Sequence, residues 1–278
     1  MAAMIRSDAR FACQTYSWQM SADRFRGRAR HMTEIAAQAG FRGFEPEIFM
    51  LGSDWSASAL AADLAAADLQ LAALCLVEDW RGGRETEAER READAAIDAV
   101  AASPGSVLNL VIMPGADRAD LRERQRHALA CMGDIAERAA DRGVAATFHP
   151  NSPTGSVFRV ADDYALLFDE RPEALGFTPD VGHIANGGMD PIALIRQTAE
   201  IIRHVHIKDI AADGTWATTG DGVLDIPAIV DTLDEIGYTC WIAFEDESPL
   251  AERDPDEAVR RTGAFIRRTL LTTSEDIP

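Results

Sequence analysis

Residues that can bind a divalent metal are concentrated in the second half of the chain, where each follows a short apolar stretch. Asp180 and His183 follow the stretch 175–178, and His206 and Lys208 end the next one. Imidazole and carboxylate are the groups that zinc and related divalent cations take from proteins. Such groups at the ends of successive apolar stretches predict a metal site at one rim of a β/α barrel.

Other apolar stretches end in the same residue types. Across the chain, the polar residues at these ends are Glu45, Glu47, His149, Asn151, Asp180, His183, His206, Lys208, Asp209, Glu245, Asp246 and Glu247. In a β/α barrel the chemistry lies on the loops that follow the strands. We therefore expect a cation held by imidazole and carboxylate groups from four neighbouring strands.

Each of these residues also has a purely structural interpretation. A single histidine such as His149 is more often a core residue than a ligand. His204 is expected to lie in the packed interior, because alternation places it on the same side as His206 but lower in the barrel. Asp180 could cap the helix that follows it, and Lys208 could form an ion pair with its neighbour. The coincidence of four successive strands with a ligand at the same end favours the metal site.

Two polar loops follow predicted strands and could cover a bound substrate. In the loop Asn151–Arg159, Arg159 either binds an anionic or carbonyl group or faces water. The loop Gly220–Asp225 contains two close glycines, which usually indicate a tight turn, although it follows a strand that carries ligands. Trp216 lies near a strand end, where an aromatic face can stack on a sugar ring.

The apolar stretches alternate with helical segments and predict a closed parallel barrel. The expected strands are residues 11–18, 41–45, 69–77, 107–113, 144–148, 175–178, 205–207 and 241–244, and the expected helices are residues 28–39, 57–67, 82–102, 121–142, a segment from 161, 191–203, 227–236 and 256–271. No Gly-x-Gly-x-x-Gly motif follows a strand, which disfavours an open doubly wound sheet. We predict a single (β/α)₈ TIM barrel over residues 1–278, in line with the roughly 250 residues typical of that fold.

Composition and charge exclude several classes of partner. The net charge of -19 disfavours nucleic acid and anionic membrane surfaces, since phosphate binding needs clustered lysine and arginine. No apolar run is long enough to span a membrane and no signal peptide is recognisable, so a cytoplasmic protein is expected. The four cysteines lack a Cys-x-x-Cys pair and are expected to be buried, reduced thiols.

Several motifs together resemble those of the xylose-isomerase-like barrel superfamily. They are Asp180-Val-Gly-His183, His204-Val-His206-Ile-Lys208-Asp209, the Gly220-Asp221-Gly222 loop and the segment Gly237–Glu245. The likeness covers most of the chain and is strongest over residues 144–247. Within the superfamily, the sequence is most similar to the sugar phosphate isomerase/epimerase group that includes inosose dehydratases and ketose 3-epimerases.

The resemblance implies a metal site built from Asp180, His206 and Glu245. The family's fourth ligand ends the fifth strand, where the epimerases carry a glutamate and this chain has His149. The two-glutamate epimerase mechanism therefore cannot be transferred intact. The inosose dehydratases are more similar here, because they have histidines at the start of the same loop.

The implied chemistry is removal of a proton next to a carbonyl, with the enediolate stabilised by a divalent cation, most simply Mn²⁺, with Mg²⁺, Zn²⁺ or Co²⁺ as alternatives. Glu245 is the expected base and His149 the expected acid or ligand. The residues expected to contact a small carbohydrate substrate are Glu45, Asn151, Arg159, His183, Lys208 and Trp216. An isomerase/epimerase is expected, and a lyase (an inosose-type dehydratase or an enzyme that cleaves 3-keto-glycosides) is the alternative.

Three further classes of protein are compatible with the fold. An endonuclease is disfavoured by the negative charge and by too few ligands for a multi-zinc site. A metal-free sugar-binding protein and a subunit of a heteromeric lyase remain alternatives. A homo-oligomer or a small partner subunit is possible.

Overall fold

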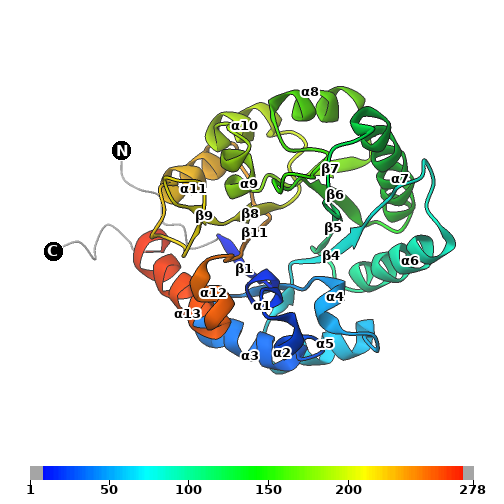
Figure 1. Ribbon diagram of the computed structural model, residues 1–278. Coiled ribbons are helices and arrows are strands. Elements are labelled where there is room, and N and C mark those ends of the chain that lie inside the picture. The colour runs from blue at the N-terminus through cyan, green and yellow to red at the C-terminus, as the bar shows by residue number, and fades with distance from the viewer. Residues whose placement is uncertain (1–8, 272–278) are drawn as a thin grey trace.

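The computed structural model describes residues 9–271, which form a barrel of parallel strands inside a ring of helices (Figure 1). The strands are β1 (Arg10–Gln14), β2 (Gly43–Glu45), β3 (Gln70–Leu71), β4 (Ala73–Glu78), β5 (Val107–Ile112), β6 (Ala145–His149), β7 (Leu175–Phe177), β8 (Val205–Ile207), β9 (Asp209–Ile210), β10 (Trp216–Ala217) and β11 (Trp241–Phe244). The helices are α1 (Tyr16–Gln19), α2 (Ala22–Phe25), α3 (Ala29–Ala39), α4 (Ile48–Leu51), α5 (Ala57–Ala66), α6 (Glu87–Ala101), α7 (Leu121–Asp141), α8 (Ala161–Glu170), α9 (Val181–Asn186), α10 (Pro191–Thr198), α11 (Ile226–Glu235), α12 (Pro249–Arg253), α13 (Pro255–Phe265) and the π-helical turn Ile266–Leu270.

The barrel consists of two curved sheets that meet along two seams. One sheet has the order β3-β2-β1-β11-β8 and the other β4-β5-β6-β7. At the first seam the amide of Cys75 donates to the carbonyl of Pro46 at 2.9 Å. At the second, the amide of His206 donates to the carbonyl of Pro179 at 3.0 Å, and Asp180 pairs with His206 as a parallel bridge. Since β3 and β4 are one strand interrupted at Ala72, the described residues form eight strands in a closed circle, and the predicted TIM barrel is confirmed.

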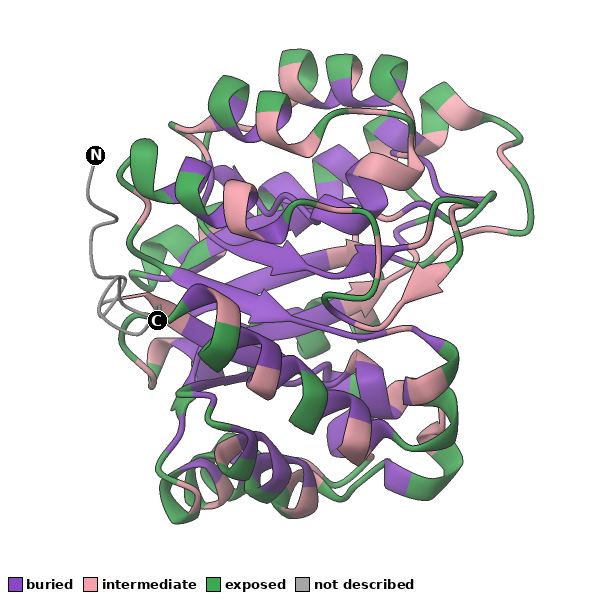
Figure 2. Ribbon diagram, turned by 90° about the vertical axis from the view of Figure 1, so that its left-hand side faces the viewer, coloured by how far each residue is buried: buried purple, intermediate pink, exposed green. Residues whose placement is uncertain are grey.

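The strands are almost entirely buried, whereas the helices expose their outer faces (Figure 2). At the amino-terminal end of the barrel, the indole of Trp241 packs among the small residues Ala12, Ala72 and Ala243. A Cβ at Gly43 would lie 2.6 Å from that indole ring. The ring therefore closes this end because its neighbours are small, and the polar groups are left to the opposite end.

Helix boundaries differ from the prediction where side chains cap the backbone. The predicted first strand 11–18 ends at Gln14, whose side chain accepts from the amide of Tyr16 and turns the chain into α1. The charged segment 82–102 becomes helical only at Glu87, because Thr86 and Glu89 form a capping box. The predicted helix 191–203 stops at Thr198, which leaves Ile202 free to pair with Phe177.

The cysteine prediction was correct for three residues and wrong for one. Cys13, Cys75 and Cys131 are buried and free, whereas Cys240 is free but exposed, because it lies in the turn that precedes β11. Within residues 9–271, no helix has both the length and the apolar character needed to cross a membrane.

The glycine loop after β10 is held by a single buried carboxylate. Asp209 accepts hydrogen bonds from the amides of Gly220 (3.0 Å), Gly222 (3.0 Å) and Leu224 (3.2 Å). Gly220 has a φ of +89°, which favours glycine. The loop is thus fixed to the barrel rim by Asp209, and the antiparallel pair β9–β10, which the sequence did not predict, precedes it.

Replacement of Asp209 should destabilise the barrel rim. In Asp209→Ala three loop amides lose a charged acceptor, so we expect the free energy of unfolding to fall by roughly 2–4 kcal/mol. Urea denaturation followed by circular dichroism measures this change. Asp221→Ala, an exposed aspartate of the same loop, is the matched control and should be neutral; equal losses in both variants would contradict the anchoring role.

Candidate metal centre

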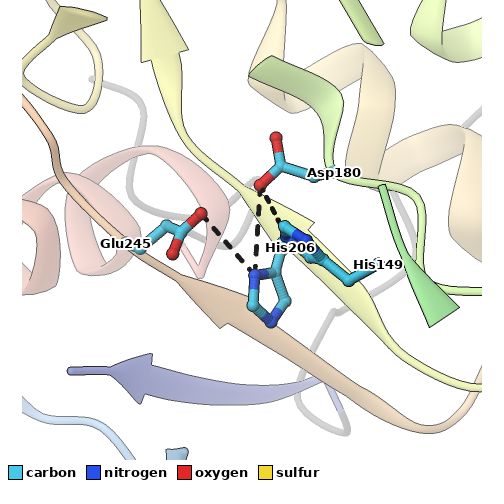
Figure 3. Close-up of side chains that lie close together, drawn as sticks. All are labelled: His149, Asp180, His206 and Glu245. Atoms are coloured by element: carbon cyan, nitrogen blue, oxygen red, sulfur yellow. Dashed lines mark hydrogen bonds and ion pairs between the residues drawn. The ribbon is translucent and has the colours of Figure 1, made fainter. Parts of the chain in front are cut away.

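Four predicted ligands meet at the carboxyl-terminal end of the barrel. His149 ends β6, Asp180 follows β7, His206 lies in β8 and Glu245 follows β11, and one ligand atom from each lies within 4.8 Å of the other three. Figure 3 shows the three contacts that join them. They are His149 Nε2 to Asp180 Oδ2 (3.2 Å), His206 Nδ1 to the same oxygen (3.9 Å) and His206 Nδ1 to Glu245 Oε1 (3.6 Å).

The strand register explains why these side chains converge. The bridge between Asp180 and His206 lies on the seam between the two sheets, so their side chains are neighbours in space. The amide of Glu245 donates to the carbonyl of Ile207 at 3.1 Å, which places Glu245 beside the end of β8. Asp180 also caps α9: its Oδ1 accepts from the amide of His183 at 2.7 Å, while Oδ2 faces the other ligands. One oxygen of Asp180 therefore caps the helix, and the other is available to bind a metal.

Glu45 lies beneath the four ligands and fixes the orientation of His206. Its Oε2 accepts from His206 Nε2 at 2.8 Å and from His204 Nε2 at 2.6 Å, and its Oε1 accepts from Asn109 Nδ2 at 2.9 Å. Glu45 is completely buried. Because Nε2 of His206 is bonded to Glu45, the opposite nitrogen Nδ1 must face Asp180 and Glu245.

The charges of this buried pair stabilise each other. Burial alone would raise the pKa of Glu45, but His206 and His204 outweigh it and hold the pKa well below its usual range. Burial would likewise lower the pKa of His206, yet Glu45 and Glu245 raise it to about 10. Without a cation His206 is therefore an imidazolium, and a metal that takes Nδ1 must displace a proton.

Lys208 places a second positive charge against the carboxylates. Its Nζ lies 2.6 Å from Glu245 Oε1 and 3.4 Å from Asp180 Oδ2, and it also contacts Glu247. Burial disfavours the ammonium ion, but Asp180, Glu245 and Glu247 raise its pKa well above the usual value. A Cβ at position 182 would lie 2.4 Å from Lys208 Cγ, so Gly182 leaves the room in which this side chain lies.

The cluster forms the floor of a cavity of about 120 Å³, which we call the inner cavity. Its lining includes three of the four ligands, His149, His206 and Glu245, together with Lys208. The remaining polar lining residues are Gln14, Tyr16, Gln19, Glu47, Asn151, His183 and Glu247. A small molecule in this cavity would contact carboxylate, imidazole, amide and ammonium groups at once.

The residues expected to contact substrate divide into two groups. Asn151, His183 and Lys208 line the inner cavity. Glu45 does not, since both its oxygens are bonded below the ligands, and a direct contact with substrate hydroxyls does not fit this placement. Arg159 also lies outside the lining, because its Nε donates to the carbonyl of Ser152 at 2.8 Å and fixes the loop.

Trp216 supports the site from behind. Its ring packs edge-on against His183 with centroids 5.2 Å apart, and Lys208 Nζ lies 4.8 Å from its centroid. Trp216 is not among the residues that line the inner cavity. The expected stacking of Trp216 on a sugar ring is therefore replaced by a cation–π contact with Lys208.

Several residues of the site were missed in the sequence or were given no role there. Glu247 was named only as a polar residue at a strand end, although it follows Glu245 by two positions and strand alternation could have placed both in the cavity. Asn109 is the single polar residue of the apolar strand Val107–Ile112, which was a usable signal. Tyr16 and Gln19 lie on α1, and the predicted strand 11–18 covered Tyr16 but not Gln19.

The ligand set fits a divalent cation. Nδ1 of His206 is buried and has no hydrogen-bond partner among the described residues. Two imidazoles and two carboxylates suit borderline cations such as zinc, manganese or cobalt. The contact from Glu45 to the far nitrogen of His206 matches the carboxylate–histidine–metal arrangement that fixes a ligand's tautomer.

Comparison with known families identifies the barrel. Residues 33–269 match the model of the xylose isomerase-like TIM barrel family, and the chain belongs to this family. It is 33% identical over 143 residues to the rhizopine catabolism protein MocC of Rhizobium meliloti, covering 45% of this chain and 42% of that protein. It is 29% identical over 155 residues to an inosose dehydratase of Clostridium beijerinckii, covering 49% and 51% respectively. The matches thus span about half the length of these curated relatives.

Solved structures show the same fold over nearly the whole chain. A 3-keto-D-glucoside 4-epimerase from E. coli superposes with a TM-score of 0.73 at 16% identity, covering 94% of this chain and 99% of that one. An IOLI protein with a bound zinc atom superposes with a TM-score of 0.71 at 15% identity, covering 95% and 99%. At these identities the likeness concerns the fold alone.

Glu45→Gln should weaken metal binding although it removes none of the four ligands. The variant keeps all four ligands but removes the negative charge that orients His206, so we expect metal affinity to fall by roughly 10–100-fold. Isothermal titration with Mn²⁺ and Zn²⁺ measures the affinity. Glu78→Gln changes another carboxylate at a strand end, one that does not belong to the cluster, and serves as the control. Unchanged affinity in Glu45→Gln would refute the orienting role.

Glu47 should make stability depend on pH. Burial raises the pKa of Glu47 from 4.5 to about 7, so the folded state binds this proton more tightly than the unfolded state. The associated stability is complete below pH 4.5 and is lost as the pH rises through 7. In the presence of a chelator, the free energy of unfolding of Glu47→Gln should equal that of the wild type at pH 4.5. Above pH 7 it should exceed the wild-type value by up to about 3 kcal/mol. Denaturation at several pH values tests this, with exposed Glu137→Gln as control; a pH-independent difference would contradict it.

Proposed function

We propose that the protein is a divalent-metal-dependent enzyme that removes a proton next to the carbonyl of a keto-sugar or a related cyclic polyol. The observation that carries the proposal is the convergence of His149, Asp180, His206 and Glu245, three of which line the inner cavity. The curated relatives named inosose dehydratase support this substrate class. Soluble carbohydrates of this kind need no basic surface, in keeping with the net charge of -19.

Glu245 is the proposed base. Its carboxylate lines the inner cavity and is paired with Lys208, so it is positioned to take a proton from a carbon above it. His149 lines the same cavity from β6 and is the proposed proton donor. Lys208 and His183, whose Nζ and Nε2 lie 2.9 Å apart, would hold a substrate oxygen.

The charge state and the contacts of His183 fit a positioning role. Burial and the nearby Lys208 hold the pKa of His183 well below its usual range, so the ring is neutral. Its Nδ1 lies 2.9 Å from the hydroxyl of Ser152, and its Nε2 faces Lys208. A neutral ring held at both nitrogens can keep Lys208 in position for a substrate oxygen without competing for the reacting proton.

Asp180, His206 and Glu245 would hold the cation, with His149 either as the fourth ligand or as the proton donor. When bound, a divalent cation acts as a Lewis acid that polarises the carbonyl and lowers the barrier to proton removal. The candidate cations are Mn²⁺, Zn²⁺, Co²⁺ and Mg²⁺.

Loss of water is the outcome we favour after proton removal. Glu245 and His149 are chemically different, which suits a reaction that needs one base and one acid rather than two equivalent carboxylates. The dehydratases among the curated relatives point the same way. Isomerisation or epimerisation, the outcome expected from the sequence, is the second candidate, supported by Glu47 and Glu247 as additional carboxylates on the cavity wall.

Glu245→Gln should abolish proton removal. Loss of the base should lower the rate of solvent deuterium uptake next to the carbonyl by at least about 100-fold. Mass spectrometry of inososes and keto-hexoses incubated with the manganese-loaded protein in heavy water measures this rate and identifies dehydrated or epimerised products. Glu252→Gln, an exposed glutamate on α12, is the control.

Chelation provides an independent check on the same assay. Elemental analysis should find about one divalent metal per chain, and deuterium uptake should disappear with chelator and return with added metal. Normal uptake in Glu245→Gln would remove Glu245 as the base. Absence of both metal and uptake in the wild type would reject the proposed function.

A further inference from the structure

Three side chains beside the metal centre form a second group with the ligand types of a cation site. One ligand atom from each of His183, Glu245 and Glu247 lies within 4.8 Å of the other two. Glu245 belongs both to this group and to the four ligands described above. Too few ligands for several metal ions were expected from the sequence, whereas the structure brings together more than a single cation requires.

The ammonium group of Lys208 is in contact with all three members of this second group. Its Nζ lies 2.9 Å from His183 Nε2 and 2.6 Å from Glu245 Oε1, and it donates to Glu247 Oε1. Asp180 Oδ2 lies 3.4 Å from the same nitrogen. Lys208 is only 2% exposed, so protein atoms supply most of the surroundings of its charge.

The groups around Nζ form the donor set of a divalent cation. An ammonium ion can only donate, so His183 Nε2 directs its lone pair toward Lys208, as the carboxylate oxygens do. One imidazole nitrogen and several carboxylate oxygens directed at one point are typical ligands of zinc or manganese. The ammonium has only three N–H groups for the four acceptor atoms around it. The acceptors therefore exceed what the ammonium can satisfy.

The same two oxygens lie beside both positive positions. Asp180 Oδ2 and Glu245 Oε1, whose side chains are drawn in Figure 3, contact His206 Nδ1 and also Lys208 Nζ. His206 and Lys208 are two positions apart, and so are Glu245 and Glu247. Because side chains two positions apart on an extended chain point to the same side, the repeat places a second cation position next to the first.

Lys208 is the only lysine in the chain, and every other residue counted with it as basic is an arginine. Lysine carries a compact point charge, whereas the guanidinium of arginine is broad and planar. Gly182 leaves the room for the lysine side chain, and the Trp216 ring lies 4.8 Å from Nζ. A compact charge at a fixed place is what a substitute for a metal ion requires.

We propose that the ammonium of Lys208 occupies the second cation position of a two-cation centre. The protein thus binds one divalent metal beside a built-in positive charge. Removal of the lysine side chain opens a second metal site made by His183, Glu245 and Glu247. The inference rests on the metal centre of the proposed function for the first cation, and it adds the nature of the second. Two adjacent positive charges can stabilise negative charge on substrate oxygens, as pairs of metal ions do in two-metal sites.

The number of metal ions bound per chain tests the inference without any measurement of turnover. Wild type and Lys208→Ala are freed of metal with a chelator, dialysed against Mn²⁺ and analysed by elemental mass spectrometry. We expect about one Mn²⁺ in the wild type and about two in Lys208→Ala, separated by roughly 3.5–4 Å. Electron paramagnetic resonance should then show coupled ions in Lys208→Ala and an isolated ion in the wild type.

Two further variants assign the second ion to its ligands. The double variant Lys208→Ala/Glu247→Gln removes a carboxylate that belongs only to the second group, and it should return to about one Mn²⁺. Lys208→Met is the matched control, because its uncharged side chain ends beside the position of Nζ and still fills the space. It should also bind about one Mn²⁺.

The outcomes separate this inference from the proposed function. A single Mn²⁺ in Lys208→Ala, or a second ion that is uncoupled or persists in the double variant, would overturn the second cation position even if wild-type deuterium uptake is normal. Two coupled ions in the wild type would overturn it as well, whatever the stability of the variants. Coupled ions in Lys208→Ala without deuterium uptake by the wild type would support the inference and reject the proposed reaction.

Discussion

The buried contact between Glu45 and His206 is the interaction on which the site depends. A carboxylate and an imidazole with negligible exposure would each be costly alone, and removal of one partner of such a pair typically costs roughly 3–5 kcal/mol. The contact explains why the strand interior at this level is polar. Asn109 and His204 are present because the oxygens of Glu45 need donors that do not compete for the metal-facing nitrogen of His206.

In the barrel, apolar packing lies at the amino-terminal end and the polar groups of the site lie at the carboxyl-terminal end. Trp241 fills the amino-terminal end among small residues, and the guanidinium of Arg10 lies over its ring at 4.0 Å. At the other end, positive and negative side chains are in contact: His206 with Glu45, and Lys208 with Asp180, Glu245 and Glu247. These contacts allow several ionised groups to coexist with little access to water.

The sequence predicted the barrel and the four converging ligands, because strand-end residues can be read from apolar stretches. It did not predict which residues would support them. Glu45 and Glu47 are both acidic and two positions apart, yet one lies below the ligands and the other faces the cavity, since the chain turns at Pro46 toward α4. Trp216 was expected to contact substrate, but β9 and β10 form an antiparallel pair that turns its ring toward Lys208. Side-chain direction after a strand ends is set by loop geometry, which periodicity does not encode.

The four proposed metal ligands are divided between the two sheets of the barrel. His149 and Asp180 belong to one sheet or follow it, and His206 and Glu245 belong to the other. A cation bound to all four would cross-link the sheets at one seam, where few backbone hydrogen bonds join them. At the other seam Glu47 pairs with Cys75, and both residues line the inner cavity. Metal binding would thus hold the two sheets together at one seam and leave the other to backbone hydrogen bonds.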